Sequence, residues 1–153
     1  MAPRMAALLA TSGVLHDNPD LHFVFVEYNA GWLAWAMDTL DYYTAAFSEA
    51  GTTPQGKKWV NVELSEPPSV YLRRQVHATF QDDTVGMHNL ALTGARALLW
   101  GSDYPHHEGT YPHSRETVAR LAKDVPDDDV ELVFRRNAID LFHFDEDVLA
   151  QPL

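Results

Sequence analysis

Three short apolar runs, each followed by a helical pattern, constrain the fold of this chain more than any other feature. They occupy residues 22–27, 76–80 and 95–100. The first run is aromatic and β-branched, so we expect a strand that is buried on both faces and ends in Glu27. Strands that alternate with helices pair in parallel through right-handed crossovers. The pattern therefore predicts an α/β layer or barrel.

The segments after these runs carry helical signals. Apolar residues recur at helical intervals over 31–50, and Gly51 follows as a stop. A weaker helical stretch runs from Asp82 to Leu92, and a third helix begins at Ser114 with an apolar face that extends to Val125. Together the strands and helices make three βα units.

Further helices are predicted outside these units. One lies around residues 4–11, and a short one over 70–75 follows the Pro67-Pro68 pair. The last helix begins at 127–129 and continues to Leu141, with Asp128 and Glu131 at the spacing of a capping box.

The remaining segment, 51–66, contains glycine, proline and lysine and is interpreted as an insertion loop. The length of 153 residues suits one domain, 1–153. A complete (β/α)8 TIM barrel takes about 250 residues, so this chain holds only the last three βα units and a C-terminal helix of such a barrel. It is either a fragment or a partial barrel that covers its open edges by forming a homo-oligomer.

Composition excludes several classes of function. The formal net charge of −11 disfavours nucleic acid and anionic membranes as partners. The chain has no cysteine, so a disulfide framework and Cys-based metal sites are excluded. No apolar run approaches the roughly 20 residues that cross a bilayer. We therefore expect a cytoplasmic protein without a membrane partner.

Candidate functional groups follow the strands, because the ends of parallel barrel strands form the open rim. They are Glu27, the region from His77 to Gln81, and Asp103. A carboxylate directly after an apolar strand is costly to bury without a cation, a hydrogen-bond network or water. A plain loop or helix cap is the structural alternative for Asp103.

The run Leu98-Leu99-Trp100-Gly101-Ser102-Asp103-Tyr104-Pro105-His106 and its continuation to Pro112 resemble the last-strand signature of the amidohydrolase-related family. This TIM-barrel group includes metal-dependent hydrolases and the aminocarboxymuconate-semialdehyde and resorcylate-type decarboxylases. Three further segments agree with the family in the expected order. They are His22–Glu27 with Gly31-Trp32-Leu33, Arg73–Asp83, and Arg135–Ala138.

The resemblance implies a site at the end of the last strand. Asp103 matches the family's aspartate, a catalytic residue and metal ligand, and the expected cofactor of the full-length parent is a divalent metal, zinc or manganese. Where many relatives have a histidine, this chain has Glu27, as a catalytic residue or in a structural role beside Trp32. His106 is the third catalytic candidate. The implied partner is a small-molecule carboxylate, hydrolysed or decarboxylated.

Substrate contacts are expected from Tyr104, Trp32 and His77. The alternatives are aromatic core packing for the first two and a hydrogen-bonded buried histidine for His77. His107 directly follows His106, and adjacent residues project in different directions, so only one of the two is a candidate. No supporting constellation surrounds the other histidines, which are His16, His22, His88, His113 and His143.

Part of the family's ligand set is absent. The sequence has no His-x-His or Glu-x-His pair, which relatives carry on the first strand, and no matching fifth-strand histidine. The leading hypothesis is therefore the C-terminal portion of an amidohydrolase-like hydrolase or nonoxidative decarboxylase, inactive alone. Two alternatives stay open: a non-catalytic self-associating half barrel or scaffold without metal, and a small-molecule binding module at the same rim.

Overall fold

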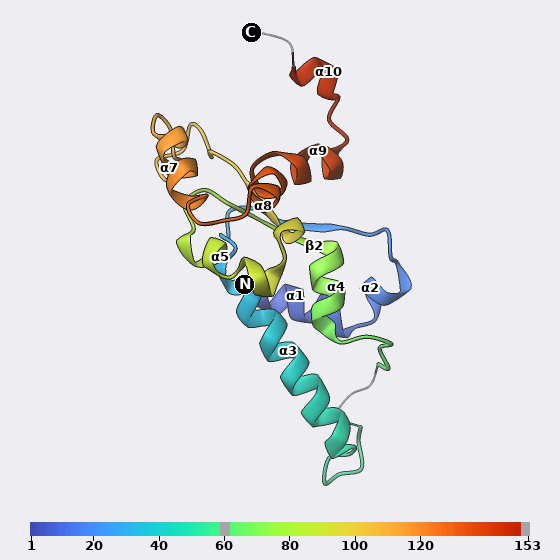
Figure 1. The fold of residues 1–153 in the computed structure, drawn as a ribbon. Coiled ribbons are helices and arrows are strands. Elements are labelled where there is room, and N and C mark those ends of the chain that lie inside the picture. Colours follow the sequence, from blue (N-terminus) through green and yellow to red (C-terminus); the bar gives the residue numbers. More distant parts are fainter. Residues whose placement is uncertain (59–61, 151–153) are drawn as a thin grey trace.

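A three-stranded parallel sheet lies at the centre of the computed structural model, which describes residues 1–58 and 62–150 (Figure 1). The strands are β1 (Phe23–Phe25), β2 (Val76–Phe80) and β3 (Leu98–Trp100), in the spatial order β1-β2-β3. Val24 pairs with His77, and Ala78 pairs with Leu98. All three predicted strands are present and parallel, as the βα alternation requires.

Helices connect and flank the strands. α3 runs for 20 residues between β1 and the later segments, and in Figure 1 it extends away from the rest of the chain. α4 leads directly into β2. The bounds of the helical elements are α1 Ala2–Thr11, α2 Val14–Asp17, α3 Gly31–Ala50, α4 Pro68–Gln75, α5 Thr84–His88, α6 Leu90–Thr93, η1 Ala95–Ala97, α7 Ser114–Leu121, α8 Asp127–Glu131, η2 Leu132–Arg136, α9 Asn137–Phe142 and α10 Glu146–Leu149.

The core is formed where α1, α3 and α4 pack against one another and where α4 and η2 pack on the sheet. Its largest fully buried side chains include Tyr71, Phe80 and Leu33. Phe80 and Trp100 both contact the ring of Phe134, which joins the carboxyl ends of β2 and β3 to η2. This packing fixes the edge of the sheet at which the strands end.

β1 differs from the prediction in length and burial. The predicted strand over 22–27, buried on both faces, is only three residues long, and all three are half-buried. Glu27 adopts a left-handed φ of 63°, which is incompatible with extended pairing, and Val26 is exposed. β1 is also an edge strand, so one of its sides has no strand to cover it.

The third strand is shorter than predicted as well. Residues 95–97 form the 3₁₀ turn η1, and β3 begins only at Leu98. The Ala97 N–H donates to the Gly94 carbonyl oxygen, and the Arg96 carbonyl oxygen contacts the ring of His77. These local hydrogen bonds outweigh the apolar pattern of the segment.

The later helices are more interrupted than predicted. Asn89 separates α5 from α6, and α7 ends at Leu121. The last predicted helix contains a π-helical segment, η2, between α8 and α9. The capping box predicted from Asp128 and Glu131 is wrong: α8 starts after Pro126 without any side-chain cap. The carboxylates of its first turn are stabilised only by the helix dipole.

The predicted loop over 51–66 has no helix or strand in its described parts, 51–58 and 62–66, and a single bridge pairs Thr52 with Lys58. Residues 59–61 of this loop lie outside the described residues. The single-domain organisation remains a prediction. Within the described ranges, no helix combines the length and apolarity needed to cross a membrane.

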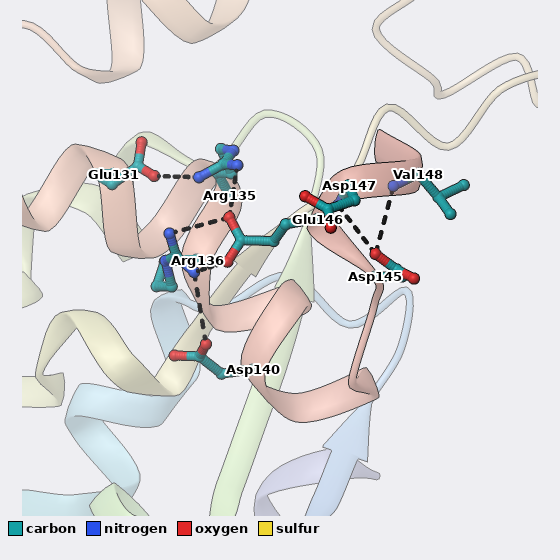
Figure 2. A network of polar contacts seen from close by, with 8 residues as sticks. All are labelled: Glu131, Arg135, Arg136, Asp140, Asp145, Glu146, Asp147 and Val148. Atoms are coloured by element: carbon teal, nitrogen blue, oxygen red, sulfur yellow. Dashed lines mark hydrogen bonds and ion pairs between the residues drawn. The ribbon is translucent and has the colours of Figure 1, made fainter. Parts of the chain in front are cut away.

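The C-terminal helix α10 is attached to η2 through ion pairs (Figure 2). Glu146 accepts hydrogen bonds from Arg135 at 3.0 Å and from Arg136 at 2.6 Å. The Asp145 side chain caps the helix by accepting from the N–H groups of Asp147 and Val148. The two guanidinium groups, Arg136 first, lower the pKa of Glu146, so this carboxylate stays charged.

Candidate metal centre

β1 and β3 lie on either side of β2, so the segments that follow them meet where the carboxyl ends of the parallel strands lie, which we call this edge of the sheet. The Glu27 N–H donates to the hydroxyl of Thr79 on β2 at 3.1 Å. On the other side, the Gly101 N–H donates to the Phe80 carbonyl oxygen at 3.0 Å. These bonds attach the first residues after β1 and β3 to the end of β2.

Glu27, Asp103 and His106 form a cluster at this edge. One ligand atom from each lies within 4.8 Å of those of the other two. His106 Nδ1 is 3.0 Å from Asp103 Oδ1 and 3.7 Å from Glu27 Oε1. The Asp103 side chain is 14% exposed, whereas those of Glu27 and His106 are more than half exposed. The structure thus brings together the three residues predicted as catalytic.

The backbone is in the left-handed region at both carboxylates. Glu27 has a φ of 63° and Asp103 a φ of 56°. Residues other than glycine are uncommon there, and such strain concentrates at functional sites. At each position the turn ends the extended chain and directs the carboxylate toward the other strand end.

The loop after β3 holds Asp103 and His106 through its own backbone. The Asp103 carbonyl oxygen accepts from the His106 N–H at 2.9 Å, and the Ser102 carbonyl oxygen accepts from the Thr110 N–H at 2.9 Å. Gly109 fits against this turn only because it has no side chain: a Cβ there would lie 2.8 Å from the Asp103 carbonyl oxygen. The loop therefore requires glycine at this position.

The donor set fits a divalent metal ion. Asp103 Oδ2 is buried and has no hydrogen-bond partner among the described residues, which is costly for a carboxylate oxygen. A cation at the cluster would satisfy it. Two carboxylates and an imidazole are ligands that suit zinc and manganese. Asp103, Glu27 and His106 are the residues that would hold such an ion.

The carboxylates also act on His106. Its hydrogen bond to Asp103 and the charge of that residue raise the pKa of His106 above its usual value, with smaller contributions from Glu108 and Glu27. The two carboxylates thus favour positive charge at the cluster, either a proton on His106 or a cation. This electrostatic field adds to the case for a cation.

His77 lies elsewhere. It is the second residue of β2, so it is near the amino end of the strand and away from the carboxyl ends. Its Nδ1 is 3.1 Å from the Arg96 carbonyl oxygen, and its Nε2 is 2.9 Å from His22 Nδ1. Burial lowers the pKa of His77. The structure does not bring His77 to the cluster, and the alternative of a buried, hydrogen-bonded histidine describes it.

The two aromatic candidates are also outside the cluster. The Trp32 indole N–H donates to the Asn29 carbonyl oxygen at 2.9 Å, and its ring packs edge-on against Phe25. Tyr104 is 67% exposed and packs against Tyr111. Their proposed contact with substrate remains a prediction.

Sequence reasoning missed the role of Asp83 in building this edge. Its buried carboxylate accepts three backbone hydrogen bonds, from Ala30 at 2.6 Å, Gly31 at 2.7 Å and Gly86 at 2.8 Å. It therefore joins the start of α3 and the start of α5 to the end of β2. The signal was available, because Asp83 follows its strand as Asp103 follows β3.

A small cavity of about 210 Å³ lies beside Glu27. Its other lining residues include Gln81, Asp82 and Glu108. Both carboxylate oxygens of Asp82 accept from the same nitrogen of Arg120, Nη2, at 2.6 Å. Among the described residues, the space next to the cluster is therefore lined by polar side chains and open to solvent.

A parallel βα sheet with polar side chains gathered where its strands end is the arrangement of α/β-barrel proteins. The Amidohydrolase family matches residues 4–144, and the chain belongs to this family. The predicted family and the partial TIM barrel are both confirmed. No curated protein matches the chain.

Solved structures show the same fold. An amidohydrolase from Mycobacterium avium subsp. paratuberculosis K-10 is similar with a TM-score of 0.70 and 22% identity, over 91% of this chain and 32% of its own. 5-Carboxyvanillate decarboxylase from Sphingomonas paucimobilis is similar with a TM-score of 0.68 and 20% identity, over 92% of this chain and 39% of its own. A dihydroxybenzoic acid decarboxylase from Polaromonas sp. JS666 was solved with manganese and 2-nitroresorcinol. It is similar with a TM-score of 0.67 and 18% identity, over 95% of this chain and 41% of its own.

The chain spans about a third to two fifths of the length of these proteins. Three strands of a barrel are consistent with that share. A barrel site draws its groups from several strands. The described residues supply the groups at the ends of three strands.

Proposed function

We propose that this chain forms the C-terminal part of a metal-dependent amidohydrolase-type enzyme that hydrolyses or decarboxylates a small carboxylate substrate. The single observation that carries the proposal is the cluster of Glu27, Asp103 and His106 with an unpartnered carboxylate oxygen at its buried side. Family membership and decarboxylase structures among its neighbours support this class of reaction.

Asp103 is the principal ligand in this proposal, with zinc or manganese as the metal. When bound, the ion would lower the pKa of a coordinated water and polarise a substrate carboxylate. Asp103 would offer Oδ2 to the ion while Oδ1 stays at His106. Asp103 raises the pKa of His106, so an ion held by this imidazole would have to displace a proton.

Glu27 has a different role from the histidine that many relatives carry at this strand end. A carboxylate adds negative charge beside Asp103 and His106 and favours a cation more than a neutral imidazole would. Its 56% exposed side chain can also reach a substrate group from the open side. We assign it to the metal or to proton transfer.

Activity in this proposal requires more ligands than these residues provide, so the chain is inactive alone. A polypeptide that adds the further barrel units should catalyse metal-dependent turnover of a small aromatic carboxylate. Asp103→Ala should abolish that activity, with Asp82→Ala, at the same edge, as the control. Unchanged activity of Asp103→Ala would remove the site assignment.

The second candidate is a non-catalytic half barrel that self-associates as a homo-oligomer or scaffold. The outer edges of β1 and β3, which pair with no strand among the described residues, favour it. It predicts an oligomer without stoichiometric metal, measured by light scattering together with elemental analysis. A monomer with one tightly bound metal ion would contradict it.

A further inference from the structure

A second cavity, of about 470 Å³, lies at the opposite end of the sheet from the metal centre. His22 precedes β1, His77 is near the start of β2, and Arg96 precedes β3. All three line this cavity, so it sits at the amino ends of the strands. No part of the proposed reaction uses these residues.

Basic residues are concentrated around this cavity. Three arginines line it, Arg73, Arg74 and Arg96, against two aspartates. The whole chain has the opposite balance, with 11 basic and 22 acidic side chains. Three of its eight histidines line the cavity as well, including His143 from the end of α9. The cavity is therefore a cationic region on an acidic protein.

Several of these charges have partners, and Arg96 does not. Arg74 pairs with Glu66 at 3.5 Å, and Arg73 donates to the Leu92 carbonyl oxygen at 2.8 Å. Of the aspartates, Asp140 is 4.0 Å from Arg136. The exposed Arg96 side chain makes no ion pair or hydrogen bond within the described part of the chain. Its guanidinium is free to bind a ligand.

The two histidines form a hydrogen-bonded chain that is directed toward the cavity. The Arg96 carbonyl can only accept, so His77 donates through Nδ1 and its Nε2 accepts. His22 Nδ1, 2.9 Å away, must then donate to that Nε2. The imidazolium form of His22 would use its second N–H, at Nε2, for a ligand. His77 is buried, so it fixes the ring of the exposed His22.

We infer that this cavity binds a small anion that carries a phosphate or carboxylate group, through Arg96, with Arg73 and His22 at its side. Guanidinium and imidazolium N–H groups are strong donors to such oxygens. Asp20, which has no ion-pair partner in the described ranges, opposes the ligand and sets a low affinity. The site is independent of the metal centre.

Isothermal titration calorimetry on the chain, with inorganic phosphate and separately with succinate at constant ionic strength, tests this inference. At least one dianion should bind saturably, and the tighter of the two identifies the source as phosphate or carboxylate. Arg96→Gln should weaken binding about tenfold, while Arg115→Gln, an exposed arginine on α7, should not.

Asp20→Asn should change the affinity for the anion in the opposite direction from Arg96→Gln. Removing this negative charge should tighten binding severalfold, an effect that misfolding cannot produce. His22→Gln should weaken binding, because it removes the imidazolium donor. Absence of saturable binding by either dianion, or equal affinity of wild type, Arg96→Gln and Asp20→Asn, would overturn the inference.

Discussion

Gly109 is the residue on which the loop of the metal centre depends most directly. A Cβ at this position would meet three backbone carbonyl oxygens, those of Ser102, Asp103 and His106, at 2.8 to 3.0 Å. Gly109→Ala should therefore displace the loop and destabilise the fold by about 1–3 kcal/mol, measured by urea unfolding.

Gly101 provides the matched control. It lies in the same loop, has no positive φ, and a Cβ there would meet nothing within 4 Å. Gly101→Ala should change the free energy of unfolding by less than about 1 kcal/mol. Equal losses for the two variants would contradict the packing described around Gly109.

Asp82 and Asp83 are neighbours with very different roles. Asp83 is buried and accepts three backbone hydrogen bonds, so Asp83→Ala should cost about 3 kcal/mol in the free energy of unfolding. Asp82 pairs with Arg120 at the surface, and Asp82→Ala should cost less than about 1 kcal/mol. Thermal and urea unfolding measure both, and a larger loss for Asp82→Ala would refute the assignment.

The buried His77 should make the stability of the fold depend on pH. Burial lowers its pKa below the value of about 6.5 in the unfolded chain. Between the two pKa values the unfolded chain binds more protons, so stability falls as the pH drops below about 6.5 and is unaffected above it. Urea unfolding from pH 5 to 8 should show this loss reduced in His77→Gln. The exposed His113→Gln should behave as wild type, and an unchanged profile in His77→Gln would exclude the assignment.

At the scale of elements, ion pairs attach α10 to η2. Glu146 of α10 forms ion pairs with Arg135 and Arg136, and none of the residues of α10 is buried. Glu146→Gln should therefore speed hydrogen exchange and proteolysis of residues 145–149 while global stability hardly changes. High salt should have the same effect on the wild type.

Asp147→Asn is the control for this prediction. Asp147 is in the same helix, and its carboxylate makes no ion pair in the described ranges. Its exchange and proteolysis rates should match those of the wild type. Protection of 145–149 that survives in Glu146→Gln would show that another contact holds α10.

Element types were largely predictable from the sequence, and many of their ends were not. The periodic pattern over 31–50 gave α3 with its observed bounds, because a long amphipathic pattern dominates local effects. Residues 95–97 turned instead of extending, since the Ala97 N–H donates to the Gly94 carbonyl oxygen and the Arg96 carbonyl oxygen contacts the ring of His77. The second contact joins residues that are 19 positions apart and leaves no periodic signal.

The site was predictable to the extent that strand ends locate it. Glu27 and Asp103 were expected at the rim and meet there with His106. His77 was placed at the same rim wrongly, although it is the second residue of the predicted strand over 76–80 and therefore lies near its amino end. His22 escaped notice since its partner is 55 residues away.

At the scale of the whole molecule, the two ends of one sheet have opposite character. The carboxyl ends carry the acidic cluster with its unpartnered Asp103 oxygen, and the amino ends carry the arginine-lined cavity. A cation is therefore expected at one end and an anion at the other. The chain as a whole matches about a third of an amidohydrolase barrel, and the proposed metal centre lies within that third.

Manganese binding, followed by electron paramagnetic resonance, tests the central claim most directly. The chain should bind Mn²⁺ weakly at one site, and Asp103→Asn should weaken that binding by at least about tenfold because it removes the principal ligand. Asp82→Asn, the nearby acid outside the cluster, should bind as the wild type does. Equal Mn²⁺ affinities of wild type and Asp103→Asn, or no binding by the wild type, would contradict a metal centre at Asp103.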